Sequence, residues 1–179
     1  MYVQIKGEVD RNRPGVDSKT PWPAPSGEQQ CGLDQAMAML KESADQGHVG
    51  AQFFCGFVYD FGSGVAEDNH LAFVYYEKAA LQGHAHAQCA LGVLYEHGRG
   101  VLQSHGKAFR FYHQSAAQGN SDAQYNLGVC YRDGRGCEQS FEHSVKWTEK
   151  AALQGHASAQ CSLGFAYEHG QGVPQSGDK

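Results

Sequence analysis

The chain has 179 residues, a formal net charge of -5 at pH 7 and 41% hydrophobic residues. This composition suits one compact domain or one short repeat array with an apolar core. The acidic balance and the lack of a lysine or arginine run exclude the cationic stripe that non-specific nucleic-acid binding needs. We therefore expect no nucleic-acid partner.

The sequence shows no membrane or export signal. No stretch approaches the roughly 20 apolar residues of a membrane span, and the opening residues MYVQIKGEVDRNRPG lack the apolar centre of a signal peptide. We expect no membrane insertion and a cytoplasmic location, or a periplasmic or secreted one if the native chain starts before Met1.

Residues 1–30 form a leader outside any repeat. Four of the five prolines lie there, at positions 14, 21, 23 and 25, a composition typical of extended or partly disordered chain. Val3 and Ile5 suggest a short strand without an evident partner. The leader is followed by a repeat array over 31–173 and a tail over 174–179.

The array repeats with a period of 36 residues and no insertion. Positions in one phase carry the same residue in four copies: Gly47, Gly83, Gly119 and Gly155; Gln52, Gln88, Gln124 and Gln160; Gly56, Gly92, Gly128 and Gly164; Tyr59, Tyr95, Tyr131 and Tyr167. A period of 20 to 50 residues indicates a solenoid, whose units cover their apolar faces by stacking on one another.

Each period predicts a helical hairpin. In the segment 69–83, the residues Ala72, Tyr75, Tyr76, Ala79 and Ala80 form one helical stripe. Glycine at the end of this segment favours termination, because it adopts the left-handed conformation at little steric cost.

The next segment predicts a second helix. Ala87, Leu91 and Tyr95 lie four residues apart on one face. Gly92 lies beside that face and recurs in every copy, although glycine costs a helix about 1 kcal/mol relative to alanine. We therefore expect another helix backbone to pass close to this position.

The pattern AQxxLGxxYxxGxGV, followed by an alanine-rich aromatic helix, resembles the Sel1-like repeat family, which is related to tetratricopeptide repeats. The matching residues include Ala87, Gln88, Leu91, Gly92, Tyr95, Gly98, Gly100, Val101, Ala108, Phe111, Tyr112, Ala116, Ala117 and Gly119. The resemblance implies an all-α, right-handed α-α superhelical solenoid with complete repeats near 48–83, 84–119 and 120–155. A helix near 33–46 and another near 157–169 would form half-repeats at the two ends.

Four positions depart from the repeat pattern: Cys55, Cys137, Ser144 and Thr148. Cys55 replaces leucine, Ser144 replaces alanine, and Thr148 replaces the second aromatic residue of its helix. These changes leave the predicted fold intact. The array ends where another second helix would begin, so we expect the last helix to lack cover, and self-association through the uncovered terminal helices is an open alternative.

Histidines and cysteines supply little support for catalysis or metal binding. His48, His84, His156 and Asn120 follow the terminating glycines, where a polar side chain caps the next helix. Cys55, Cys130 and Cys161 occupy small apolar positions and are expected to be buried thiols. Cys137 would be reactive only if a cation lowered its pKa. We expect no catalytic residues, no metal and no cofactor.

Helix phase predicts an exposed inner wall. If Ala51, Cys55 and Tyr59 face the core, the opposite side of the same helix carries positions 53, 57 and 60. The predicted partner-binding residues in all copies are Phe53, Phe54, Phe57, Asp60, Cys89, Val93, Glu96, Tyr125, Asn126, Val129, Arg132, Cys161, Phe165 and Glu168. The row at 57, 93, 129 and 165 fits partner contact or packing between neighbouring helices equally well.

The array and its aromatic wall predict a non-enzymatic scaffold or adaptor that binds a protein or peptide through the concave face. The resemblance to Sel1-like repeats implies the same. A narrower alternative is a bacterial immunity protein or secretion-linked factor that neutralises or escorts a toxin or effector. The rival class is a metal- or thiol-dependent enzyme that uses His97, His169 or Cys137.

Overall fold

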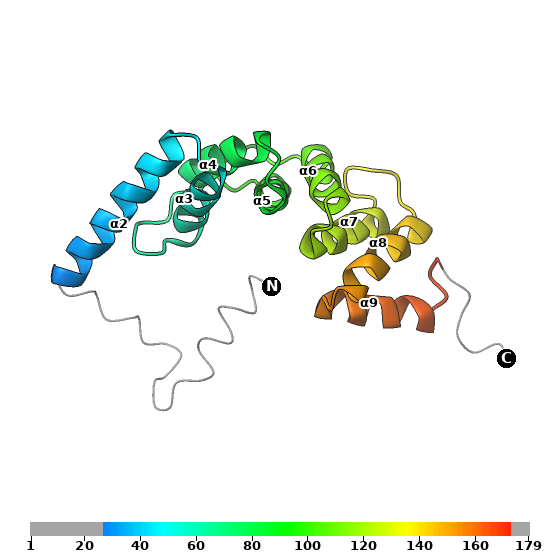
Figure 1. Cartoon of the computed structure of the whole chain (residues 1–179). Helices are drawn as coiled ribbons and strands as arrows, with labels where there is room; N and C mark the ends of the chain where they lie inside the picture. Colours follow the sequence, from blue (N-terminus) through cyan, green and yellow to red (C-terminus); the bar gives the residue numbers. More distant parts are fainter. Residues whose placement is uncertain (1–26, 173–179) are drawn as a thin grey trace, which may run out of the picture.

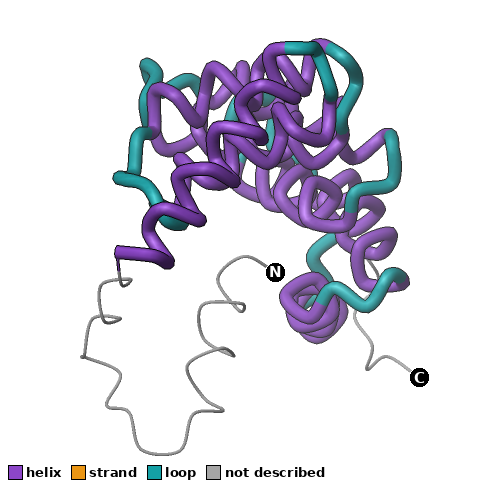
Figure 2. The backbone as a smooth tube through the Cα atoms, turned by 60° about the vertical axis from the view of Figure 1, so that its left-hand side comes forward, coloured by secondary structure: helices purple, strands orange, loops and turns teal. Residues whose placement is uncertain are grey.

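The computed structural model describes residues 27–172, and the expected strand at Val3 and Ile5 lies outside them. Its helices are α2 (Gly27–Asp45), α3 (Val49–Phe61), α4 (Asn69–Leu81), α5 (Ala85–His97), α6 (His105–Ala117), α7 (Ser121–Asp133), α8 (Phe141–Leu153) and α9 (Ala157–Glu168). Figure 2 shows only helices and loops in this part of the chain. The predicted all-α solenoid is confirmed.

The helices stack in chain order into an arch, with α2 at one end and α9 at the other (Figure 1). The closest pairs are the hairpins α3 with α4, α5 with α6, and α7 with α8. Helix α2 is longer than predicted, because it begins at Gly27 rather than near residue 33.

Short-range hydrogen bonds set where the helices begin. The side chains of His48, His84 and His156 each accept a hydrogen bond through Nδ1 from a backbone amide three residues later, at 3.1–3.2 Å. Asn120 does the same through Oδ1 at 2.8 Å. These bonds satisfy amides that have no partner within the helix, so the predicted capping roles are confirmed.

The core is made of alanines and a few large side chains. The predicted stripes are buried except at one position: Ala72, Tyr76, Ala79 and Ala80 on α4, and Ala87, Leu91 and Tyr95 on α5. Tyr75, the remaining residue of the α4 stripe, is half-buried. Small residues bring the helix axes close together, and the tyrosines then fill the space that remains.

The recurrent helix glycines accommodate those tyrosines. A Cβ atom on Gly92 would lie 2.5 Å from ring carbons of Tyr112, and one on Gly56 would lie 2.5 Å from the ring of Tyr76. At Gly56 and Gly92 a buried aromatic ring needs the space. At Gly128 the expected helix backbone does pass close, because a Cβ atom there would lie 3.2 Å from the Ser144 carbonyl oxygen of α8.

A glutamine ladder connects successive hairpins. Gln88 Nε2 donates to the Ala80 carbonyl at 3.3 Å, and Gln88 Oε1 accepts from Gln118 Nε2 at 2.7 Å. The same two bonds recur at Gln52 and at Gln124. Each glutamine thus joins the end of the preceding helix to the end of the second helix of its own hairpin, and its burial makes those bonds costly to lose.

Candidate functional site

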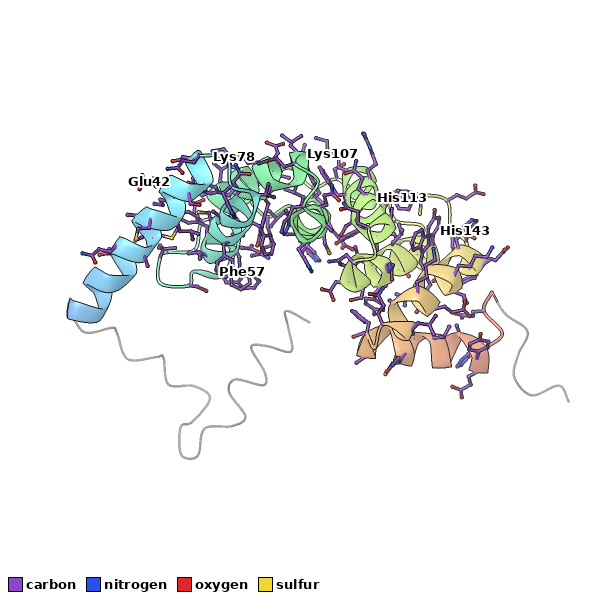
Figure 3. The ribbon with its side chains drawn as sticks, viewed as in Figure 1. Glu42, Phe57, Lys78, Lys107, His113 and His143 are labelled. Atoms are coloured by element: carbon purple, nitrogen blue, oxygen red, sulfur yellow. The ribbon has the colours of Figure 1, made fainter. Side chains whose placement is uncertain are left out.

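Three phenylalanines of α3 form an aromatic cluster on the inner side of the arch. The ring centroids of Phe54 and Phe57 are 6.1 Å apart, and those of Phe57 and Phe61 are 4.7 Å apart. Figure 3 shows Phe57 on the inner side, whereas Lys78 and Lys107 lie on the outer side. Phe54 is 57% exposed, so this cluster presents open aromatic surface.

The row that contains Phe53 and Tyr125 lies in the seam between neighbouring repeats. The Phe53 ring stacks on His84 at 4.6 Å between centroids, and the Tyr125 ring stacks on His156 at 4.8 Å. Each histidine also caps the helix that begins directly after it. Both aromatic side chains therefore pack against the next repeat, and their contact with a partner stays a prediction.

Cys89 occupies the same row but is buried, with 8% of its surface exposed. Burial raises the pKa of its thiol to about 12, opposed by a hydrogen bond with Asn126. The prediction that Cys89 belongs to an exposed wall is wrong, because Cys89 lies in a buried cluster with Ala123 and Leu127 of α7.

Asp60, the first residue of the predicted charged margin, bonds within the protein rather than facing solvent. Asp60 is 7% exposed and accepts hydrogen bonds from Tyr76 Oη at 3.4 Å and Arg99 Nη2 at 2.7 Å. Burial raises the pKa of this carboxyl, and the Arg99 charge opposes the rise. The prediction that Asp60 is an exposed rim residue is wrong.

Glu96 repeats this arrangement one hairpin later. It accepts from Tyr112 Oη at 2.7 Å and from Arg135 Nη1 at 2.9 Å. We call each set an acid–tyrosine–arginine cluster: Asp60, Tyr76 and Arg99, then Glu96, Tyr112 and Arg135. Because each arginine lies 39 residues after its acid, the clusters join consecutive hairpins.

The remaining wall residues divide by position. Phe57, Val93, Val129, Asn126 and Arg132 are half-buried. Val93 packs against the core cluster that contains Leu127, so part of this row serves inter-helix packing. On the last described helix, the predicted wall residues are exposed: Cys161, Phe165 and Glu168. The expected burial of Cys161 is wrong, because no described helix follows α9 to cover it.

The arrangement of the repeats is that of a known family. The Sel1 repeat profile matches residues 33–48, 49–84, 85–120, 121–156 and 157–179. This chain is a Sel1 repeat protein. A search of curated protein sequences found no match to it.

Solved structures of other Sel1 repeat proteins are similar to this one. The crystal structure of c5321, a protective antigen of uropathogenic Escherichia coli with an SLR fold, is 35% identical with a TM-score of 0.78, covering 80% of this chain and 31% of that one. A Sel1 repeat protein from Oxalobacter formigenes is 32% identical with a TM-score of 0.73, covering 83% of this chain and 62% of that one. This chain thus spans less than two thirds of either relative.

Helicobacter pylori cysteine rich protein B shares the fold. It is 22% identical with a TM-score of 0.60, covering 78% of this chain and all of that one. Sel1 repeat proteins are in general protein-interaction scaffolds and typically non-enzymatic.

The Cys137 thiol of this Sel1 repeat protein is not activated by its surroundings. Cys137 Sγ donates to the Cys130 carbonyl at 3.5 Å, and burial raises the pKa of the Cys137 thiol rather than lowering it. Among residues 27–172, no group of three histidine, cysteine or acidic side chains is placed to hold a metal ion. Over the same range, no helix combines the length and apolar character needed to cross a membrane.

Sequence reasoning missed the glutamine ladder and the acid–tyrosine–arginine clusters. Their signal was in the alignment of the copies, because Asp60 and Glu96, Tyr76 and Tyr112, and Arg99 and Arg135 share phases. The third copy changes all three positions together, to Arg132, Thr148 and Gln171. Such joint change marks residues that touch one another.

Proposed function

We propose that this Sel1 repeat protein is a non-enzymatic scaffold that binds a partner protein or peptide through the concave face of its arch. The observation that carries the proposal is the α3 cluster of Phe54, Phe57 and Phe61. Exposed aromatic side chains that lie next to half-buried ones are typical of binding hot spots, because they supply large contact area at low entropic cost.

The copies differ at the position of Phe54, which supports a localised contact. The equivalent residues are Ala90, Asn126 and Ser162, so the middle of the wall has small side chains. Phe165, which is 53% exposed on α9, provides a second aromatic position at the far end of the arch. A partner that lies along the concave face would meet an aromatic anchor near each end.

Quantitative capture from a lysate of the source organism tests this proposal. We expect Phe54→Ala to weaken capture of the main partner at least tenfold, because truncation of a hot-spot aromatic residue costs about 2 kcal/mol or more. Leu81→Ala is the matched control, since Leu81 is an exposed apolar residue (82%) on α4 and outside the α3 cluster.

Circular dichroism and a thermal melt should show that both variants are folded. Equal recovery of every captured protein by the wild type and by Phe54→Ala would contradict the assignment to α3. Equal loss with Leu81→Ala would show that capture depends on general surface hydrophobicity rather than on the α3 cluster.

A further inference from the structure

A cavity of about 400 Å³ lies between α7, α8 and α9. Its apolar wall includes Tyr125, Val129, Val145 and Leu163. Its polar wall includes Arg132 and Asp133 at the end of α7 and Thr148 on α8. Protein sites for small ligands typically have volumes of about 300–1,000 Å³, so the cavity is large enough to be occupied.

The cavity exists because the third repeat lacks a tyrosine. Tyr76 and Tyr112 are among the largest fully buried side chains, and their rings lie over Gly56 and Gly92. The equivalent residue on α8 is Thr148, whose hydroxyl faces Gly128. Threonine is smaller than tyrosine, and both Thr148 and Arg132 line the cavity, so the cavity borders the positions that hold the tyrosine and its acid in the first two repeats.

The polar partners of the missing ring have also changed. In the first two clusters the tyrosine hydroxyl lies beside an acid that an arginine neutralises. In the third copy Arg132 replaces the acid and Gln171 replaces the arginine. All three residues of the cluster therefore differ from those of the first two copies.

The rebuilt cluster holds charge at the cavity wall. Arg132 donates to both oxygens of Asp133, from Nε at 2.8 Å and from Nη2 at 3.3 Å. Hydrogen bonding from Arg132 lowers the pKa of Asp133, so this carboxylate stays ionised at neutral pH. Arg135 Nη2 also lies 3.1 Å from Asp133 Oδ2, so the groups offered to a hydroxyl that enters the cavity are the Arg132 guanidinium N–H donors and the remaining lone pairs of the Asp133 carboxylate.

We propose that this cavity binds the phenol ring of a tyrosine side chain presented by the partner protein. The inference rests on the proposed scaffold function and names the group that is recognised. The protein itself shows the fit, because Tyr76 and Tyr112 fill the equivalent space in the first two repeats. A cavity of about 150 Å³ already holds a benzene ring, which leaves room for the hydroxyl and for the peptide that carries it.

The test uses p-cresol, which is the tyrosine side chain without its backbone, and N-acetyl-tyrosinamide. Binding is followed by amide chemical shifts of the ¹⁵N-labelled protein. We expect shifts at the ends of α7 and α8 and in α9, with N-acetyl-leucinamide at least tenfold weaker. Absence of binding by p-cresol, or shifts confined to other helices, would overturn the proposal.

A filled variant provides the decisive comparison. Thr148→Tyr combined with Arg132→Glu and Gln171→Arg restores the residues of the second cluster and should occupy the cavity internally. We expect it to fold and to bind p-cresol at least tenfold more weakly. Leu153→Ala is the control, because Leu153 is an exposed residue (89%) of α8 outside the cavity lining, and it should bind p-cresol as the wild type does. Equal binding by the filled variant would overturn the proposal.

Partner capture separates this proposal from the scaffold proposal. The filled variant should capture at least tenfold less partner. If it captures as much as wild type while Phe54→Ala does not, the scaffold proposal stands and the tyrosine proposal fails. Binding of p-cresol together with undiminished capture would mark a free phenolic compound as the ligand and would also overturn it. If only the filled variant loses the partner, the cavity proposal stands and the α3 assignment fails.

Discussion

Replacement of Gly92 or Gly164 by alanine makes the same chemical change at the same repeat position and should have opposite effects. A Cβ atom at Gly92 would lie 2.5 Å from ring carbons of Tyr112, which is fully buried. At Gly164 no atom outside its own helix neighbourhood lies within 4 Å of the new Cβ. The comparison isolates the tertiary contact, because both glycines are inside helices.

The expected changes in the free energy of unfolding combine a gain in helix propensity with a cost of overpacking. Alanine in place of a helix-interior glycine favours the folded state by about 1 kcal/mol at either position. At Gly92 the added methyl group forces the Tyr112 ring to move by about 1 Å to reach van der Waals distance, and such overpacking costs about 1–3 kcal/mol. The ring is also held by its 2.7 Å hydrogen bond to Glu96, a charged contact worth about 1.5–3 kcal/mol.

We therefore expect Gly92→Ala to lower the free energy of unfolding by up to about 2 kcal/mol, and by more if the Tyr112–Glu96 hydrogen bond is also weakened, whereas Gly164→Ala should raise it by up to about 1 kcal/mol. Urea unfolding measures the first, and the melting temperature should fall by about 2–4 °C per kcal/mol. Amide hydrogen exchange in α9 measures the second, since a terminal helix opens locally. Changes of the same sign at both glycines would refute the packing account.

Three further predictions concern the histidine caps, the glutamine ladder and the exposed thiol. Burial lowers the pKa of His84 below its usual 6.5. Protonation therefore favours the unfolded chain. The stability that the neutral cap contributes is present above pH 6.5 and is lost as the pH falls through the native pKa. His84→Asn, which copies Asn120, should remove this loss; unfolding in urea at pH 7.5 and 5.5 checks it, and an equal pH dependence in both proteins would contradict it. Gln88→Ala should lower the free energy of unfolding by about 1–3 kcal/mol, because it removes two hydrogen bonds and takes the acceptor from the Gln118 side-chain amide, although the Ala80 carbonyl keeps its bond from the Gly83 amide. Gln160→Ala should cost less, since Gln160 is exposed and, within residues 27–172, its side chain bonds to the Ala152 carbonyl alone; equal losses in chemical denaturation would argue against the ladder. Cys161 should react with a thiol reagent before the buried Cys55 does, and a rate unchanged by Cys161→Ser would count against the exposure of that thiol.

Helix phase predicts the exposure of some residues of the candidate wall and not of others. The phases at 53, 57 and 60 were placed opposite the core stripe of α3, and Phe54 and Phe57 do form an accessible aromatic cluster. The same arithmetic placed Asp60 on an exposed rim, where it is in fact 7% exposed. A helix wheel describes one helix, whereas the burial of Asp60 comes from Tyr76 on the next helix and Arg99 in the next hairpin.

The sequence by itself determined the helices, their caps and their core stripes. Those features depend on residues within a few positions of one another, such as His84 with the amide of Ala87. Only the tertiary structure decided how the copies touch. The glutamine ladder joins side chains 30 residues apart, and the acid–arginine contacts join residues 39 apart. Whether a departure such as Thr148 leaves a cavity depends on how tightly three helices stack around it, and that distance is a property of the packed array.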